Sequence, residues 1–308
     1  MEFLNKIILS DCLTGIKQMP DSSVDCCISS PPYWGLRDYG VDGQVGNEQD
    51  FKEFVKKLIE LYSEIQRVLK PTGTCFVNLG DTYNGTKQGN TETNKNPKLV
   101  TDSFKKERIK DIQDKSLLMI PERFAIGMID EGWILRNQII WHKPNQMPQS
   151  ATDRFTVDFE KIFFFVKQST GYYFEQQLEP YTKPLDRWGG DDLEANGKST
   201  WDNGTGQTTY RNRNMRPSPD GKNMRTVWSI NTESFPEAHF ATYPEKLVKR
   251  MIEAGCPENG LVLDPFMGAG TTAVVAKKLN RNYTGFELNP KYKLIAENRL
   301  IKEVGLFL

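Results

Sequence analysis

The segment between Leu261 and Glu287 constrains the fold more than any other part of the chain. It contains a short apolar run ending at Asp264, a turn with Gly268 and Gly270, a helical stretch, and a second apolar run ending at Glu287. A glycine turn between a strand and a helix lets the backbone approach a ligand at the helix N-terminus. The pattern predicts an α/β fold with a ligand at the carboxyl ends of its strands. A tight turn without a ligand is the alternative.

The rest of the chain repeats this alternation of strands and helices. Short apolar runs predict strands at residues 7–11, 24–29, 74–79, 133–141, 161–166, 261–264 and 283–287. Helical spacing of apolar residues predicts helices at 51–69, 117–130, 243–254, 271–279 and 290–301, with Thr242 as the N-cap of the third. Strands that alternate with helices imply a mostly parallel, doubly wound sheet with helices on both faces.

Two irregular stretches interrupt the pattern, and plain linkers are the alternative interpretation of both. We expect residues 84–115 to be a mobile loop, because they are polar and cannot bury much apolar area. We expect residues 181–226 to be an insertion between two parts of one main domain, 1–180 and 227–308. The later half of the insertion is basic, with a single acid, Asp220, against Arg211, Arg213, Arg216, Lys222 and Arg225.

Composition excludes several classes of protein. The chain has 40 Lys plus Arg and 40 Asp plus Glu, so the net charge is zero, which argues against a general coat for nucleic acid but not against a local basic patch. Five cysteines without C-x-x-C spacing and only two histidines predict a reduced, cytoplasmic protein without a metal site. No apolar run reaches the roughly 18 residues of a transmembrane helix.

The glycine turn indicates which ligand is bound. Glu287 follows Asp264 at about the 20-residue interval at which such folds place a carboxylate on a ribose. A dinucleotide site would show G-x-G-x-x-G, but Gly270 is followed by Thr271, Thr272 and Ala273. Asp264 can pair with a positive charge. The site therefore favours S-adenosylmethionine over a dinucleotide.

A second motif, Ser30-Pro31-Pro32-Tyr33, follows directly after a predicted strand. The two prolines fix two φ angles and remove two N–H donors, which leaves a rigid loop with outward carbonyls. Tyr33 adds a flat face. Such a loop would hold a planar ring that bears an amino group. The alternative is a proline-stiffened strand exit with a core tyrosine.

In this order, the two motifs resemble those of the β group of DNA amino-methyltransferases. That family has an (S/D/N)-P-P-Y loop early in the chain and a D-P-F-x-G-x-G-T-T loop late, matched here by residues 30–33 and 264–272. Residues 11–13, 68–73, 141–145 and 239–247 are also similar to family segments. The resemblance runs from residue 7 to about residue 300.

The resemblance implies a permuted, Rossmann-like fold of the S-adenosylmethionine-dependent methyltransferases, with a mostly parallel seven-stranded sheet. The N-terminal strand would lie beside the strand that ends at Glu287, so that Asp11 and Glu287 would hold opposite ends of the adenosine. The main domain would be catalytic, and residues 181–226 would be the target-recognition region. Double-stranded DNA would be the partner. The resemblance leaves open whether a cognate restriction endonuclease accompanies the protein, and whether it is a monomer or a homodimer.

The resemblance also implies roles for single residues. The catalytic loop would be Ser30, Pro31, Pro32 and Tyr33. DNA would be contacted by Lys143, Arg211, Arg213, Arg216 and Arg225. The cofactor would be contacted by Asp11, Cys12, His239, Ala241, Thr242, Asp264, Pro265, Phe266, Gly268, Ala269, Gly270, Thr271, Thr272 and Glu287.

One segment departs from the family pattern. Many relatives carry H-P-T-x-K-P before the cofactor strand, whereas here Phe240 and Ala241 intervene and Tyr243 stands in place of the lysine. A lysine contact therefore cannot be transferred to this chain.

The resemblance implies methylation of an exocyclic amino group on a flipped base by direct in-line attack. Ser30 favours N4-cytosine over N6-adenine, although both stay open. Methylation at cytosine C5 is disfavoured, because none of the cysteines follows a proline. The alternatives from other classes are an RNA or protein N-methyltransferase and a non-catalytic nucleic-acid-binding protein.

Overall fold

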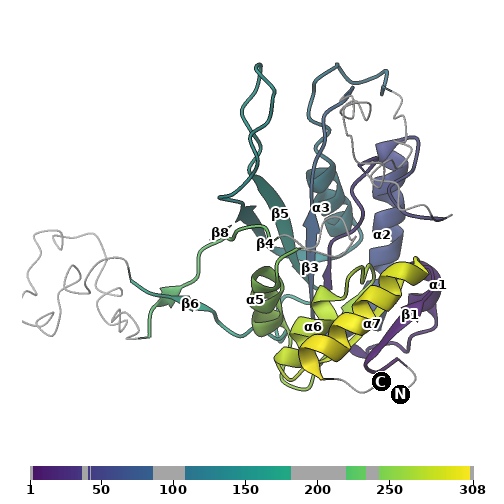
Figure 1. Ribbon diagram of the computed structural model, residues 1–308, viewed down its shortest axis with the longest axis vertical. Helices are drawn as coiled ribbons and strands as arrows, with labels where there is room; N and C mark the ends of the chain where they lie inside the picture. The colour runs from purple at the N-terminus through teal and green to yellow at the C-terminus, as the bar shows by residue number, and fades with distance from the viewer. Residues whose placement is uncertain are drawn as a thin grey trace, which may run out of the picture. The chain divides into compact units, whose positions relative to one another are not determined.

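The computed structural model describes residues 3–36, 41, 43–85, 108–181, 220–233 and 243–305. At its centre lies an eight-stranded sheet (Figure 1). The order of its strands is β1-β10-β9-β2-β3-β5-β4-β8. The strands of this sheet are β1 (Lys6–Leu9), β2 (Val24–Ser29), β3 (Leu69–Leu79), β4 (Ile134–His142), β5 (Phe159–Val166), β8 (Val227–Ser229), β9 (Leu261–Asp264) and β10 (Asn282–Glu287).

The sheet is mostly parallel, as the sequence predicts, and only β5 runs antiparallel to its two neighbours, β3 and β4. The expected number of seven strands is wrong by one. The additional strand is β8, which pairs with β4 so that Trp228 lies opposite Trp141. β8 directly follows the irregular stretch. Because it has only three residues, its sequence is too short to show a strand period.

The two ends of the chain meet in the sheet, which confirms the permuted order. β1 pairs with β10 in parallel, and Leu9 lies opposite Glu287. β10 then pairs with β9, and β9 with β2. Because all four strands are parallel, the residues that follow them lie at one edge of the sheet.

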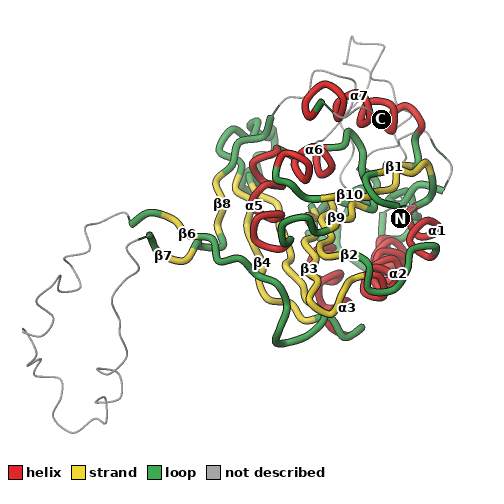
Figure 2. The backbone as a smooth tube through the Cα atoms, turned by 90° about the horizontal axis from the view of Figure 1, so that it is seen from below, coloured by secondary structure: helices red, strands yellow, loops and turns green. Residues whose placement is uncertain are grey.

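Helices cover both faces of the sheet (Figure 2). One face carries α1 (Cys12–Lys17), α2 (Phe51–Val68) and α3 (Ile120–Asp130), and the other carries α5 (Glu245–Gly255), α6 (Thr271–Lys278) and α7 (Pro290–Val304). The short helix α1 was not expected from the sequence. α5 begins at Glu245, with Pro244 in the N-cap position, and the expected cap Thr242 lies outside the described residues.

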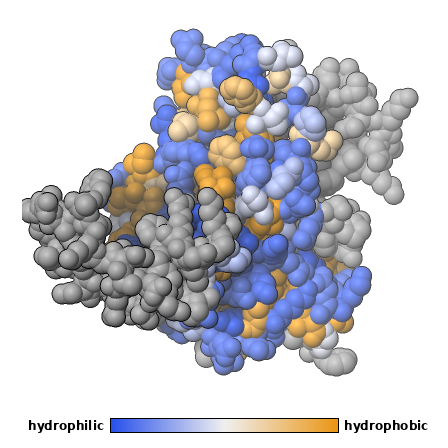
Figure 3. Space-filling view, turned by 90° about the vertical axis from the view of Figure 1, so that its left-hand side faces the viewer, coloured by the Kyte–Doolittle hydropathy of each residue, from blue (hydrophilic) through white to orange (hydrophobic). Residues whose placement is uncertain are grey.

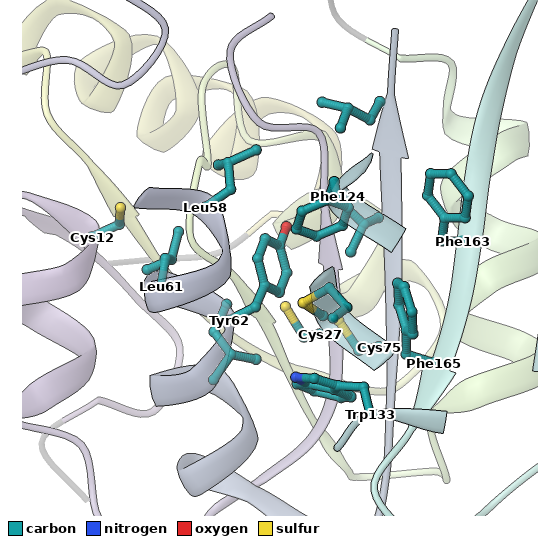
Figure 4. Packing of buried hydrophobic residues seen from close by; sticks show 14 of the residues in the cluster. Cys12, Cys27, Leu58, Leu61, Tyr62, Cys75, Phe124, Trp133, Phe163 and Phe165 are labelled. Carbon is teal, nitrogen blue, oxygen red and sulfur yellow. The ribbon is translucent and has the colours of Figure 1, made fainter. Parts of the chain in front are cut away.

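A cluster of buried apolar residues lies between α2, α3 and the sheet (Figure 4). Tyr62 of α2 meets Phe124 of α3 edge-on, with ring centroids 5.2 Å apart. Phe124 also contacts Phe163 and Phe165, two residues of β5 that point to this face. Each of these rings is almost fully buried, and its burial contributes about 1.5–3 kcal/mol to the free energy of folding. This packing holds β2, β3 and β5, and hence the loops that follow them.

The chain divides into two compact units, one formed by Met1–Glu175 with Thr226–Leu308 and the other by Gln176–Arg225. In the described part of the second unit, β6 (Leu178–Glu179) pairs antiparallel with β7 (Lys222–Asn223). The hydroxyl of Tyr181 donates to the carbonyl of Gly221 at 3.0 Å.

The face on the side of β8 is mostly hydrophilic, with apolar side chains in small separate groups (Figure 3). Among the described residues, no helix is long and apolar enough to cross a membrane.

Candidate functional site

The loops that follow β2 and β9 open on one cavity. β2 and β9 are parallel neighbours, and ligands of such sheets bind outside the carboxyl ends of the strands. The described residues that line the cavity are Ser10, Asp11, Cys12, Ser30, Pro32, Val41, Gly43, Gln44, Val45, Tyr243, Pro265, Phe266, Met267, Gly268, Ala269, Thr271, Phe286, Glu287, Leu288 and Tyr292. The cavity therefore joins the predicted target loop to the predicted cofactor loop.

Most of the predicted cofactor residues lie on this cavity. Those that line it are Asp11, Cys12, Pro265, Phe266, Gly268, Ala269, Thr271 and Glu287. Asp264, Gly270 and Thr272 do not line it and are buried. His239, Ala241 and Thr242 lie outside the described residues.

The two glycines of the cofactor loop have φ angles of 54° at Gly268 and 78° at Gly270, which favour glycine. A Cβ on Gly270 would also lie 2.8 Å from the Cβ of Ala296 in α7. The amides of both glycines donate within the protein, Gly268 to Glu287 at 2.8 Å and Gly270 to the carbonyl of Met267 at 2.9 Å. The glycines thus serve the turn and its packing. The sequence predicted that the turn would present its backbone to a ligand, but these two amides donate to acceptors within the protein.

Asp264 ends β9 inside a small hydrogen-bond network. Its Oδ1 accepts from the amide of Phe266 at 2.9 Å, and its Oδ2 accepts from the hydroxyls of Tyr243 at 2.8 Å and Thr272 at 2.5 Å. The hydroxyls of Tyr243 and Thr272 also contact each other. Burial raises the pKa of Asp264 to about 6, although the three donors favour its charged form. Asp264 therefore supports the cavity through Tyr243, which lines it.

Glu287 ends β10 and is held by backbone amides. Its Oε2 accepts from Gly268 and its Oε1 from Asn289, both at 2.8 Å. Burial raises the pKa of this carboxyl above its usual value. Each oxygen keeps a further lone pair, so Glu287 can also accept from the hydroxyls of a ligand.

Asp11 and Cys12 follow β1 on the opposite side of Glu287 from the glycine loop. Asp11 caps α1, because its Oδ1 accepts from the amide of Thr14 at 2.9 Å. Burial raises the pKa of the Cys12 thiol to about 12, so the thiol stays neutral. The cap explains why a short helix begins immediately after the strand.

The charge of the cavity restricts the ligand. Its described lining residues include the carboxylates of Asp11 and Glu287 but no Lys, Arg or His. A pyrophosphate would meet like charge here, whereas hydroxyl groups and a positive charge would find acceptors. The residues therefore fit an adenosine that carries a cationic group. Among the described residues, no cluster of His, Cys, Asp or Glu could hold a metal ion.

The target loop begins where β2 ends. Ser30 and Pro32 line the cavity, whereas Pro31 is buried. Gly46 has a φ of 104°, and a Cβ at this position would lie 3.3 Å from the Cβ of Pro32. The neighbouring loop thus packs closely on Pro32, two residues after Ser30.

Tyr33 leaves the cavity lining and joins a polar cluster that the sequence did not predict. Its hydroxyl donates to Glu160 Oε2 at 2.5 Å, and Asn78 Nδ2 donates to the same oxygen at 2.8 Å. Lys143 pairs with the other oxygen of Glu160, and its ammonium lies 4.4 Å from the ring centroid of Trp141. The only signals in the sequence were two polar residues, Asn78 and Glu160, inside or beside apolar runs.

The predicted DNA contacts are placed only in part. The side chain of Lys143 is 12% exposed and paired with Glu160, so it offers little surface to a phosphate. Arg225 is 69% exposed, and its Nε donates to Glu179 at 2.6 Å. Arg211, Arg213 and Arg216 lie outside the described residues, as do most of the insertion and of the loop at 84–115.

Comparison with known proteins identifies relatives along almost the whole chain. The family model described as DNA methylase, for N6 and N4 methyltransferases, matches residues 24–298. The Type II methyltransferase M.Cfr9I of Citrobacter freundii is 37% identical over 94% of this chain and 85% of its own length. The Type II methyltransferase M.SmaI of Serratia marcescens is 36% identical over 96% of this chain and 91% of its own.

Two solved structures share the fold. The cytosine-N4-specific PvuII DNA methyltransferase has a TM-score of 0.61 and 19% identity, over 96% of this chain and 85% of that one. The complex of M1.HpyAVI with SAM has a TM-score of 0.56 and 19% identity, over 96% of this chain and 98% of that one. At these identities the likeness shows the fold alone.

Proposed function

The chain belongs to the DNA methylase family, and we propose that it transfers a methyl group from S-adenosylmethionine to the N4 amino group of cytosine in duplex DNA. The observation that carries this proposal is the shared cavity, in which Ser30 and Pro32 of the target loop face the same space as Glu287 and the cofactor loop. A methyl donor and an amino acceptor can meet there without a covalent enzyme intermediate.

The cofactor end of the cavity would bind S-adenosylmethionine, which supplies a methyl group activated by its sulfonium. Glu287 would accept hydrogen bonds from the ribose hydroxyls, and Asp11 would lie toward the adenine. Asp264, through Tyr243 and Thr272, would add negative charge for the cationic methionine end. The complex of M1.HpyAVI with SAM, which has the same fold, supports S-adenosylmethionine as the ligand.

The target loop would prepare the amino group for attack. The exocyclic nitrogen of cytosine is a poor nucleophile, because its lone pair is conjugated with the ring. Hydrogen bonds from the amino group to Ser30 Oγ and to the carbonyl of Pro31 would pull it toward tetrahedral geometry and free the lone pair. Tyr33 would stack on the flipped base. Much of the rate would come from this positioning.

Ser30 supports cytosine as the target base, because S-P-P-Y loops in this family lean toward N4-cytosine and D-P-P-Y loops toward N6-adenine. The fold shared with a cytosine-N4-specific enzyme agrees with this choice. The second candidate is N6-adenine methylation by the same fold and mechanism.

The insertion at residues 181–226 would recognise the target sequence. Its arginines, Arg211, Arg213, Arg216 and Arg225, can contact phosphates or guanine edges. The Type II names of the relatives support a role beside a restriction endonuclease.

Methyl transfer from radiolabelled S-adenosylmethionine to duplex DNA, RNA and protein tests the proposal. We expect label in duplex DNA alone, and mass spectrometry of the nucleosides should find N4-methylcytosine. N6-methyladenine instead would overturn the choice of base but not the enzyme class. Label in RNA or protein alone, or in no substrate, would overturn the proposed function.

A further inference from the structure

Glu160 gathers three donors directly behind the target loop. Its Oε2 accepts from the hydroxyl of Tyr33 at 2.5 Å and from Asn78 Nδ2 at 2.8 Å, and its Oε1 pairs with the ammonium of Lys143. The side chains are largely buried, with 17% of Glu160 and 12% of Lys143 exposed. The proposed transfer mechanism does not yet use Glu160, Asn78 or Lys143.

The orientation of the Asn78 amide follows from this arrangement. A carboxylate only accepts hydrogen bonds, so the nitrogen of Asn78 must face Glu160. The same nitrogen lies 3.0 Å from the hydroxyl of Tyr33 and 3.5 Å from Ser30 Oγ. Asn78 is 2% exposed, and its Oδ1 has no hydrogen-bond partner among the described residues. The amide keeps this orientation at the cost of a buried acceptor without a partner.

The ring of Tyr33 is held at two places. Its hydroxyl gives its only proton to Glu160, and its ring edge lies against Gly80, where a Cβ would come within 2.5 Å of Tyr33 Cε2. Gly80 directly follows β3, the strand that carries Asn78. Two strands, β3 and β5, therefore determine the direction of the tyrosine that ends the target loop.

We propose that Glu160, neutralised by Lys143, is a positioning residue for methyl transfer that acts through Tyr33 and Asn78. This inference rests on the proposed function. Glu160 holds the Tyr33 ring in its stacking direction before the base arrives, so the ring need not be ordered during the reaction. Asn78 extends the same support toward Ser30. Lys143 serves this cluster, and its pairing keeps an uncompensated negative charge away from the incoming DNA.

The main test is the Glu160→Gln variant in steady-state methylation of duplex DNA. Gln keeps the size of the side chain but has no charge, and its amide nitrogen must face either Lys143 or the donors Tyr33 and Asn78. The variant therefore removes the ion pair with Lys143 and replaces the charged acceptor of the Tyr33 hydroxyl by a weaker, neutral one or by an opposed donor. We expect kcat to fall about 10- to 100-fold. The KM for DNA and the calorimetric Kd for S-adenosylmethionine should stay within about twofold, because neither ligand contacts Glu160 directly.

A double-mutant cycle with Tyr33→Phe separates positioning from general damage. Tyr33→Phe removes only the hydroxyl, and it should lower kcat by a similar factor. Glu160→Gln should then add little in the Tyr33→Phe background, because the two changes remove the same support. Effects that multiply would overturn the inference. Tyr33→Phe also tests the contact from its other end if Glu160→Gln does not fold.

Glu122→Gln is the matched control. Glu122 pairs with Lys161, which directly follows Glu160 in β5 and therefore points to the opposite face of that strand. The two ion pairs are similarly buried. This pair does not touch the target loop, so its loss should leave kcat unchanged. An equal fall of kcat in Glu122→Gln, or a kcat of Glu160→Gln within twofold of the wild type, would overturn the positioning role. A wild-type protein that labels no duplex DNA would instead show that the proposed function itself is wrong.

Discussion

The two ends of the site, the cofactor loop and the target loop, hold their carboxylates in opposite ways. At the cofactor end, Asp264 and Glu287 accept only from uncharged groups, the hydroxyls of Tyr243 and Thr272 and backbone amides. At the target end, Glu160 lies behind the target loop and not on the cavity lining, and it is paired with the ammonium of Lys143. The cofactor end therefore carries uncompensated negative charge, and the target end is close to neutral.

This difference agrees with what each end would bind. A buried carboxylate without a counter-ion is costly, and the raised pKa values of Asp264 and Glu287 reflect that cost. A cationic ligand would remove it. The target end would receive an uncharged base, for which shape and direction matter more than charge. We therefore expect substitutions at the cofactor end to weaken cofactor binding, and substitutions at the target end to lower the rate of methyl transfer.

The largest effect is expected at the target end. Ser30→Ala removes an acceptor for the amino group, and Tyr33→Ala removes the stacking ring. Each should lower the rate of methyl transfer by about a hundredfold or more. The Kd for S-adenosylmethionine, measured by calorimetry, should change little. A large loss of cofactor affinity in either variant would remove the distinction between the two ends.

The next effect is expected at Glu287. In Glu287→Gln, the amide nitrogen must face the N–H of either Gly268 or Asn289, so one backbone bond is replaced by two opposed donors. Affinity for S-adenosylmethionine should fall about tenfold to a hundredfold, the usual range for a lost hydrogen bond to a charged group. Calorimetry measures it, with Ser30→Ala as control. Unchanged affinity would contradict the assignment of Glu287 to the ribose.

A smaller, pH-dependent effect is expected at Asp264, whose pKa is about 6. The charged form attracts a cation, so affinity for S-adenosylmethionine should fall as the pH drops from 7 through 6. Tyr243→Phe removes one donor to the carboxylate and should move this midpoint to higher pH.

Asp264 also makes the folding stability of the protein without cofactor depend on pH. Because its pKa is higher in the folded state than in the unfolded chain, its contribution to the free energy of unfolding is greatest below pH 3.8 and is lost as the pH rises through 6.

Asp264→Asn supplies the control for both measurements. It cannot titrate, so its affinity for S-adenosylmethionine should show no midpoint near pH 6. The difference in thermal stability between wild type and Asp264→Asn should vary with pH between 3.8 and 6. A wild-type affinity that is flat between pH 5 and 7 would refute the role of the charge.

The smallest effect is expected outside the cavity. Glu303 pairs with Lys278 and Arg299, and these bonds lower its pKa to about 2, against the opposing effect of burial. Arg299 also donates to Thr271, which lines the cavity. Glu303→Gln should lower the free energy of unfolding by about 0.5–1 kcal/mol at neutral pH, since the groups are partly exposed.

The pH dependence of this contribution has a defined sign. A depressed folded-state pKa gives stability that is present above pH 4.5 and lost as the pH falls toward 2. Denaturant unfolding of wild type and Glu303→Gln should therefore converge at low pH. Glu253→Gln, which breaks a single exposed pair with Lys249 in α5, is the control with a still smaller effect.

Local patterns in the sequence predicted the elements that hold the site. The apolar runs and glycine turn from Leu261 to Glu287 appear as β9, α6 and β10, because strand and helix periods are properties of neighbouring residues. The short helix α1 and the strand β8 were missed, since six or three residues are too few to show a period. Tyr243 was seen only as a departure from a pattern, although it lines the cavity and donates to Asp264.

What the sequence determined by itself was the order of the strands and helices, the two loops and the family, because each depends on residues close together in the chain. Only the tertiary structure decided which side chains from distant segments meet. Tyr33, Asn78, Lys143 and Glu160 come from four separate segments, and no local pattern specifies their contacts. The sheet brings them together because β3, β5 and β4 lie side by side and the target loop leaves the neighbouring strand β2.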